Sequence, residues 1–399
     1  MDDSRLHDAL AAARPIELAA ELVRIPSHPG LARQEEGVAT ALAAYLDRAG
    51  LAPVLEEVAP GRPNLLCALD GAAPGPHLLL CGHTDTVPLN AADPGVGFAG
   101  AVRDGRLTGR GAVDMKGALA AMAAALAALA EAGGLAAGRV TLAAVVDEEM
   151  ESLGAEHLVR SGLTADGAVV GEPTGNRLCR GHKGLEWLEI SFVGRAAHGG
   201  APAAGVNAID GAALFVQRVR SELAPRLAAR AHPLLGPPTL NFGTVRGGDQ
   251  PSTVAAACTL TADRRSLPGE SYETMRAELE ELLAAVRREL PGLGTSVRRL
   301  AGGMATLEHV ALETPPGERV VACAAAARTR VCGAAGELGA FPAWTDGALL
   351  ASAAGIPTIV MGPGDLALAH SPRESVAIEE LTEAAALYAR TALEFCGGR

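Results

Sequence analysis

Apolar and polar positions in the first 180 residues follow two periods, one typical of helices and one typical of buried strands. Residues 41–50 and 116–132 repeat their apolar positions at a helical spacing. Continuous apolar runs predict buried strands at 65–70, 77–82 and 140–146. Because helices and strands alternate, we expect a mixed or mainly parallel sheet that is covered by helices on both faces.

The pattern changes between residues 181 and 293. A strand, a helix, two strands and a second helix are predicted there, at 185–194, 206–223, 239–245, 253–266 and 273–290. This order indicates a smaller α+β unit inserted into a larger domain. A helix at 318–330 and a strand at 356–362 then resume the first pattern. The sequence therefore predicts an α/β protein whose larger domain is discontinuous, over 1–180 and 294–399, around an inserted domain over 181–293.

Composition and charge exclude several kinds of protein. A net charge of −12 without a basic cluster argues against nucleic acid or an anionic membrane as a partner. The acidic start MDDSRLHDAL lacks the order of a signal peptide, and the longest apolar stretch is an alanine-rich segment that reads as a buried helix. Seven cysteines without a C-x-x-C pair favour a reducing compartment. We therefore expect a cytoplasmic protein.

Five residues with metal-binding side chains are spread along the chain. They are His83, Asp114, Glu149, Glu172 and His370. The segments that carry His83, Glu149 and Glu172 follow apolar runs at 77–80, 139–146 and 168–170 that read as buried strands. Function collects at the carboxyl ends of parallel strands. Two imidazoles and three carboxylates suit a pair of zinc ions about 3.5–4 Å apart, because a carboxylate between the ions offsets their repulsion.

Neighbouring residues could supply a general base and support for the metal ligands. Glu148 is a spare carboxylate that could serve as the general base for a water molecule. Since side chains alternate along a strand, Glu148 and Glu149 must lie where the strand turns into a loop. Asp85 is placed to accept the second N–H of the His83 imidazole. Glycines around Asp114 make it the best candidate to bridge two ions, although a helix cap is its ordinary alternative.

The motifs together resemble a known family. In order they are GHTDTVP, AVDMKG, DEE, GEPTG, AHGG near GVNAID, and GPG ahead of AH. From about Leu22 to the C-terminus the chain resembles the acetylornithine deacetylase and succinyl-diaminopimelate desuccinylase family, which also contains glutamate carboxypeptidase and di-zinc aminoacylases. The resemblance implies a zinc-peptidase-like catalytic domain with two Zn²⁺ per subunit, for which Co²⁺ can substitute. It also implies that the inserted domain serves as a lid and forms a homodimer.

The resemblance further implies how the metal ligands are shared. His83 and Glu172 would complete one metal site, and Glu149 and His370 the other, with Asp114 between them. An amide hydrolase also needs a donor to the oxyanion of its tetrahedral intermediate. In the family a histidine at the position of His198 serves the site of the partner subunit.

Substrate recognition is predicted from a second group of residues. By resemblance, Arg265 in the D-x-R of ADRRS would hold the substrate α-carboxylate as a planar fork, and Arg264 next to it is the alternative. Asn241 and Thr345 are further candidates for substrate binding. Ser252 stands where the family usually carries an asparagine, which leaves the amino-acid substrate open.

These observations predict a di-zinc hydrolase that removes the acyl group from an N-acylated amino acid, most like acetylornithine deacetylase. A desuccinylase, or a dipeptidase or carboxypeptidase of the same fold, is the alternative within enzymes, so the expected partner is a small N-acyl amino acid or dipeptide. A binding protein that has lost the chemistry is a remote alternative, because neither a ligand nor Glu148 is missing.

Overall fold

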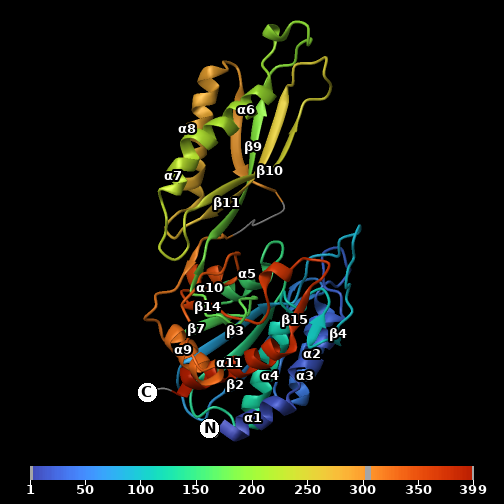
Figure 1. Cartoon of the computed structure of the whole chain (residues 1–399), viewed down its shortest axis with the longest axis vertical. Helices are drawn as coiled ribbons and strands as arrows, with labels where there is room; N and C mark the ends of the chain where they lie inside the picture. Colours follow the sequence, from blue (N-terminus) through green and yellow to red (C-terminus); the bar gives the residue numbers. More distant parts are fainter. Residues whose placement is uncertain (1–2, 302–306, 398–399) are drawn as a thin grey trace. The chain divides into compact units, whose positions relative to one another are not determined.

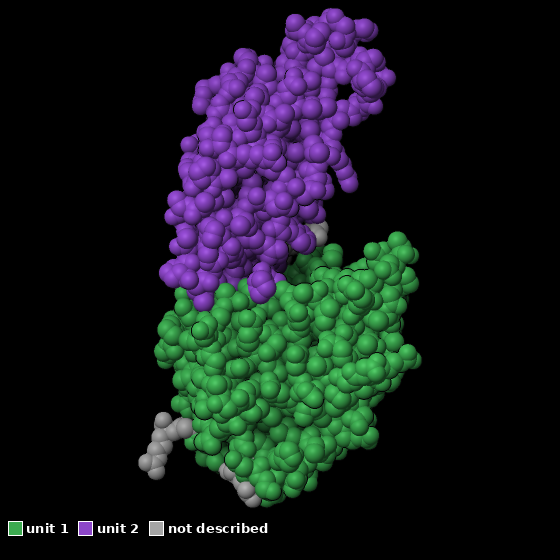
Figure 2. All heavy atoms as spheres, in the orientation of Figure 1, with its two compact units in different colours: residues 1–181, 312–341, 345–399 green, residues 182–311, 342–344 purple. Residues whose placement is uncertain are grey.

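A computed structural model describes residues 3–301 and 307–397, and the chain forms two compact units (Figure 2). Unit 1 comprises Met1–Gly181, Leu312–Phe341 and Thr345–Arg399, and unit 2 comprises His182–Ala311 and Pro342–Trp344. The chain thus passes between the units at four points. Unit 2 extends beyond the predicted boundary at residue 293, because a strand that follows this residue, β12 (Gly294–Arg299), pairs with β9 (Gly184–Val193).

Unit 1 is built on a six-stranded sheet with the order β1-β2-β6-β3-β7-β14 (Figure 1). The strands are β1 (Val54–Ala59), β2 (Arg62–Asp70), β3 (His77–His83), β6 (Arg139–Val145), β7 (Gly167–Val170) and β14 (Thr358–Val360). β3 runs parallel to β6 and β7, and β14 runs parallel to β7. β2 runs antiparallel to both of its neighbours, β1 and β6. The carboxyl ends of β3, β6 and β7 therefore meet at one edge of the sheet.

Helices cover both faces of this sheet. Along β3, Leu78 and Leu80 join one buried cluster and Leu79 and Cys81 join another. The first cluster includes side chains from α1 (Asp3–Ala12), α2 (Pro15–Val23), α3 (Glu36–Arg48), α4 (Lys116–Glu131), α9 (Arg319–Cys332) and α11 (Ile378–Gly397), and the second from α5 (Leu153–Arg160) and α10 (Gly347–Ser352). This arrangement explains why the strands read as continuous apolar runs.

The alanine-rich segment is the central helix α4, buried from Lys116 to Leu129. Its small side chains let α4 approach the sheet closely, and Gly82 in β3, which has no side chain, leaves room for this close contact. A Cβ atom on Gly82 would lie 2.3 Å from the Met115 side chain. Among the helices that the structure describes, none has the length and apolar character needed to cross a membrane.

A small three-stranded sheet in unit 1 pairs the strand that precedes the loop containing Asp114 with the strand that follows the segment containing His370. It consists of β4 (Ala101–Arg103), β5 (Arg106–Thr108) and β15 (Ser375–Ala377), in the order β15-β5-β4. A short 3-10 helix, η3 (Leu366–Leu368), precedes β15.

Unit 2 is a four-stranded antiparallel sheet with the order β10-β11-β9-β12 and helices packed on one face. The remaining elements are β10 (Thr239–Gly247), β11 (Ala257–Ser266), α6 (Ala208–Arg218), α7 (Ala224–Ala228), α8 (Tyr272–Glu289) and the 3-10 turn η1 (Pro202–Ala204). Alternate residues of β9 are buried, among them Ile190 and Phe192, which pack with Phe215 of α6 and Leu283 of α8. The predicted helix 206–223 instead ends in a π-helical segment, Val219–Leu223.

Two short strands, β8 (Gly181–His182) and β13 (Leu312–Glu313), lie where the chain passes between the units. The predicted fold class, a mixed sheet covered by helices with an inserted α+β unit, is confirmed.

Candidate active site and metal centre

His83 is the last residue of β3 and its side chain is buried. Its Nδ1 lies 3.0 Å from the carbonyl oxygen of Asp85, so Nδ1 carries the proton and donates it. The other ring nitrogen, Nε2, lies 3.0 Å from Oδ1 of Asp114 and 3.7 Å from Oε1 of Glu172. The Nε2 atom is thus directed at two carboxylates, as a metal-ligating histidine requires.

Asp114 lies between two histidines from distant parts of the chain. Its Oδ1 faces His83, whereas its Oδ2 is 3.2 Å from Nε2 of His370. The same His370 nitrogen is 3.0 Å from Oε1 of Glu149. Because the two oxygens of one carboxylate face different imidazoles, Asp114 has the geometry that a bridging ligand needs.

Glu148 and Glu149 lie in the turn that follows β6, as the alternation argument predicted. The Asp85 carboxylate accepts hydrogen bonds from the backbone N–H groups of Glu148 and Glu149, at 3.2 and 3.0 Å. Its Oδ1 is 3.4 Å from Nδ1 of His83, and the shorter contact of that nitrogen is to the Asp85 carbonyl. Asp85 therefore holds the turn that presents both glutamates in addition to standing beside the histidine.

An ion-pair network that the sequence did not reveal fixes the start of this turn. Arg62 in β2 donates to Glu35 and, at 2.6 Å, to Asp147. Asp147 has a positive φ of 73°, and its carbonyl oxygen accepts from the N–H of Ser152 at 2.7 Å. Glu35 and Arg62 belong to no recognisable sequence motif. Only their contacts in the structure show that they support this turn.

Glu172 follows β7 and is buried. Donor atoms of His83, Asp114 and Glu149 lie within 4.8 Å of one another, and so do those of His83, Glu148 and Glu172. The second group places Glu148 close enough to be a ligand itself. The structure thus brings the five predicted ligands and Glu148 together, and their individual roles remain predictions.

The positively charged groups around these carboxylates are too few to keep all of them ionised. Burial raises the pKa of Glu172 and of Glu148 well above the ordinary range, and neighbouring carboxylates add to both shifts. Burial and the charge of Asp114 raise the pKa of Glu149 as well. Hydrogen bonds to Asp114 and Glu149 raise the pKa of His370 to about 10. A cluster of this kind fits divalent cations, which would favour the ionised carboxylates.

Several predicted residues lie in unit 2, among them His198, Asn241 and Ser252. His198 is exposed, and its Nδ1 accepts from the N–H of Gly200 at 3.0 Å, which leaves Nε2 as the protonated nitrogen. Asn241 in β10 is opposite Asp263 in β11 and exposed, on the same sheet face as Arg265. Ser252 is also exposed, and its carbonyl oxygen accepts from the N–H of Gly199.

The two neighbouring arginines have different surroundings. Arg264 is buried and donates to Glu270 at 3.1 Å, whereas the Arg265 side chain is 30% exposed and forks onto Asp263 at 2.8 and 3.1 Å. Only Arg265 is accessible to a ligand. Thr345, in unit 1, is fully buried, and its Oγ1 accepts from the N–H of Gly347 at 3.1 Å, so its predicted substrate contact has no accessible atom in this structure.

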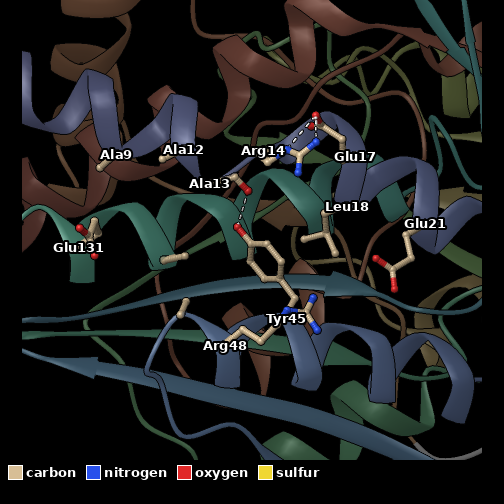
Figure 3. A pocket seen from close by; sticks show the side chains of 12 residues that line it. Ala9, Ala12, Ala13, Arg14, Glu17, Leu18, Glu21, Tyr45, Arg48 and Glu131 are labelled. Atoms are coloured by element: carbon tan, nitrogen blue, oxygen red, sulfur yellow. Dashed lines mark hydrogen bonds and ion pairs between the residues drawn. The ribbon is translucent and has the colours of Figure 1, made fainter.

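A separate hollow of about 450 Å³ lies in unit 1 among α1, α2, α3 and the end of α4 (Figure 3). Alanines and Leu18 line it together with charged side chains. Its Tyr45 hydroxyl donates to the Ala13 carbonyl at 2.7 Å, and Arg14 pairs with Glu17 at 2.9 Å. None of the predicted site residues lines this hollow, so it is separate from the candidate active site.

Comparison with known proteins agrees with the geometry. The model of peptidase family M20/M25/M40 matches residues 79–394. An acetylornithine deacetylase of Myxococcus xanthus is 32% identical over 369 residues, covering 89% of this chain and 87% of that protein. An acetylornithine deacetylase of Proteus mirabilis strain HI4320 is 30% identical over 401 residues, covering 96% of each. The aminopeptidase PepT of Bacillus cereus ATCC 10987 has a similar structure, with a TM-score of 0.77 over 96% of this chain and 98% of that chain, at 23% identity.

Proposed function

The chain belongs to peptidase family M20/M25/M40, a family of metal-dependent hydrolases, and on that premise we propose that it removes the acyl group from N-acylated amino acids. The observation that carries the proposal is the position of Asp114 between His83 and His370, with Glu148 close to His83. The acyl-amino-acid part is supported by the two relatives named acetylornithine deacetylase. The likeness to an aminopeptidase is at 23% identity and supports the fold alone.

We assign the metal ligands to two ions. His83 and Glu172 would hold one ion and Glu149 and His370 the other, with Asp114 shared between them. Nitrogen and carboxylate donors suit Zn²⁺, and Co²⁺ accepts the same set. When bound, the ions would lower the pKa of a water molecule to about 7 and would polarise the amide carbonyl.

Glu148 is the proposed general base. It would take the proton of the attacking water and then pass it to the departing amine. The Asp85 carboxylate, bonded to the N–H groups of Glu148 and Glu149, keeps the base and the neighbouring ligand in one rigid turn. A base that is positioned by a backbone contact loses little orientation during the reaction.

His198 is the proposed donor to the oxyanion. The Gly200 N–H occupies its Nδ1, so the neutral ring carries its proton on Nε2 and can donate it. This tautomer is the one that a carbonyl oxygen gaining negative charge requires. By family resemblance, His198 serves the site of the partner subunit.

Replacing Arg265 with lysine tests recognition of the substrate carboxylate. Lysine lacks the planar fork, so we expect KM to rise about tenfold or more with a smaller change in kcat. Arg264→Lys is the matched control, and because Arg264 is buried against Glu270 it should lower Tm and leave KM near the native value. Michaelis–Menten measurements and thermal unfolding of both variants decide this. Equal KM values for the native chain and Arg265→Lys would contradict the assignment.

The proposed function itself is tested by a hydrolysis screen. The substrates are N-acetyl, N-succinyl and N-formyl amino acids and a few dipeptides, each with the α-carboxylate free or blocked as an ester. We expect the highest kcat/KM for an N-acetyl amino acid with a free carboxylate. Preference for succinyl substrates or dipeptides would change the substrate class, and cleavage of blocked substrates at the same rate would contradict carboxylate recognition.

We also propose that unit 2 forms a homodimer. β10 is an edge strand, and beside it lies a hollow of about 450 Å³ between this strand and α6. Exposed apolar side chains border it, with Val245 at 67% and Ile209 at 43% exposure. Exposed edges with apolar neighbours favour pairing with another strand, and two-fold pairing of identical chains is the commonest form of it.

Mixing two inactive variants tests the partner role of His198. His198→Ala alone should lower kcat by about 10² to 10³, the effect of losing one oxyanion donor. When His198→Ala chains exchange with Glu148→Ala chains, one site of each mixed dimer would contain both residues. About half of the dimers would be mixed, so activity should recover to about a quarter of the native value. No recovery despite demonstrated exchange would mean that His198 does not act across a dimer.

A further inference from the structure

Glu374 is a fully buried carboxylate that no motif argument singled out. Its Oε1 accepts from three N–H groups of one loop, those of Gly111 at 2.8 Å, Val113 at 3.1 Å and Asp114 at 3.3 Å. Its Oε2 accepts from the guanidinium of Arg110, which belongs to the same loop. A single side chain thus accepts from three backbone N–H groups and one guanidinium of the loop that presents Asp114.

The same residue connects this loop to the other end of the site. Glu374 follows His370 by four positions, and the strand after it, β15, pairs with β5. The carbonyl oxygen of Glu374 also accepts from the N–H of Gly109 at 3.1 Å. The segment from His370 to Glu374 therefore carries one proposed ligand, His370, and accepts a hydrogen bond from the backbone of the proposed bridging ligand, Asp114.

We propose that Glu374 is a positioning residue for the metal centre: it fixes the Asp114 carboxylate in the orientation in which it faces both metal sites. The inference rests on the proposed role of Asp114 as a ligand. Carboxylates that orient metal ligands through hydrogen bonds commonly change metal affinity by about 10- to 100-fold when replaced. Here the contact is to the backbone of the ligand, so the whole loop is held.

The ionised carboxylate is needed because all of its neighbours are donors. Glutamine has nearly the same shape, but its NH₂ group would face either Arg110 or the three N–H groups of the loop. Either orientation sets one donor against another and leaves N–H groups without an acceptor. Glu374→Gln should therefore release the loop without creating a cavity.

The experiment compares metal affinity in Glu374→Gln and in a matched control. Glu270→Gln is the control, because Glu270 in unit 2 likewise accepts from an arginine, Arg264 at 3.1 Å, and from a backbone N–H, that of Leu267 at 2.8 Å. Each metal-free protein is titrated with Co²⁺ in competition with a chromophoric chelator, and Tm is measured without metal. We expect Glu374→Gln to raise at least one Co²⁺ dissociation constant about 10- to 100-fold, and Glu270→Gln to leave both constants unchanged.

The outcomes separate this inference from the proposed function. If the native chain binds no Co²⁺, the proposed metal centre is contradicted, and the inference about Glu374 fails with it. If the native chain binds Co²⁺ and Glu374→Gln binds it equally well, with only a lower Tm, then Glu374 is merely structural and the inference is overturned. Should Glu374→Gln fail to fold, Glu374→Asp, which keeps the charge but is shorter by one methylene, is titrated in its place and judged by the same criterion.

Discussion

Replacing Glu148 with alanine is expected to lower kcat by a factor of about 10² to 10⁴ and to leave the metal content intact, because general-base catalysis contributes that much. The neighbouring change, Glu149→Ala, should instead cost one metal ion, since Glu149 shares His370 with Asp114. The two variants alter adjacent residues of one turn, so a general distortion of that turn would affect them alike.

Metal content by elemental analysis and kcat by steady-state assay distinguish the two roles. Glu151→Ala is the control in the same turn, where the Glu151 backbone N–H donates to Asp147 and the side chain has no assigned role. Donor atoms of Glu148 also lie within 4.8 Å of those of His83 and Glu172. Equal loss of metal from Glu148→Ala and Glu149→Ala would therefore show that Glu148 is a ligand and that another group must be the base.

Removing the metal should abolish activity altogether. The five proposed ligands and the proposed base Glu148 are carboxylates and imidazoles, and without a cation the carboxylates repel one another, as the raised pKa values of Glu148, Glu149 and Glu172 indicate. We expect a strong chelator to reduce hydrolysis to background, and Zn²⁺ or Co²⁺ to restore it with about two ions per chain. Each bound ion should also raise the free energy of unfolding, by about 2.7 kcal/mol when free metal exceeds its Kd a hundredfold.

Mg²⁺ is the control in this experiment, because imidazole ligands favour Zn²⁺ or Co²⁺ over a cation that prefers oxygen. Activity, metal content and Tm are measured on the same preparation before and after chelation. Full activity in a thoroughly metal-free protein would contradict the proposed mechanism.

The sequence predicted the parts of this protein that depend on local patterns. The continuous apolar runs of β3, β6 and β7 predicted strands whose carboxyl ends meet, and the residues that follow those strands do converge. The position of Glu148 and Glu149 in a turn followed from the alternation of side chains along a strand. In each case the information lies within a few residues of the site.

Contacts between distant segments could not be predicted in this way. Glu374 reaches back to Gly111 across more than 260 positions, and Arg62 joins Glu35 to Asp147 from a third segment. Asp85 was expected to serve His83 alone, but the turn of β6 brings two N–H groups to its carboxylate. The strand β12 was not predicted because its sequence, GTSVRR, contains a single apolar residue, Val297, and therefore forms no apolar run.

The four passages of the chain between its units determine the order in which the protein is completed during synthesis. All elements of unit 2 lie between His182 and Ala311, so its sheet and helices exist once residue 311 has left the ribosome. At that moment the part of the chain outside the ribosome still lacks β14, α9, α11 and His370. The sheet and helices of the inserted unit can therefore form before unit 1 is complete, and the metal centre can be loaded only after residue 370 has been translated.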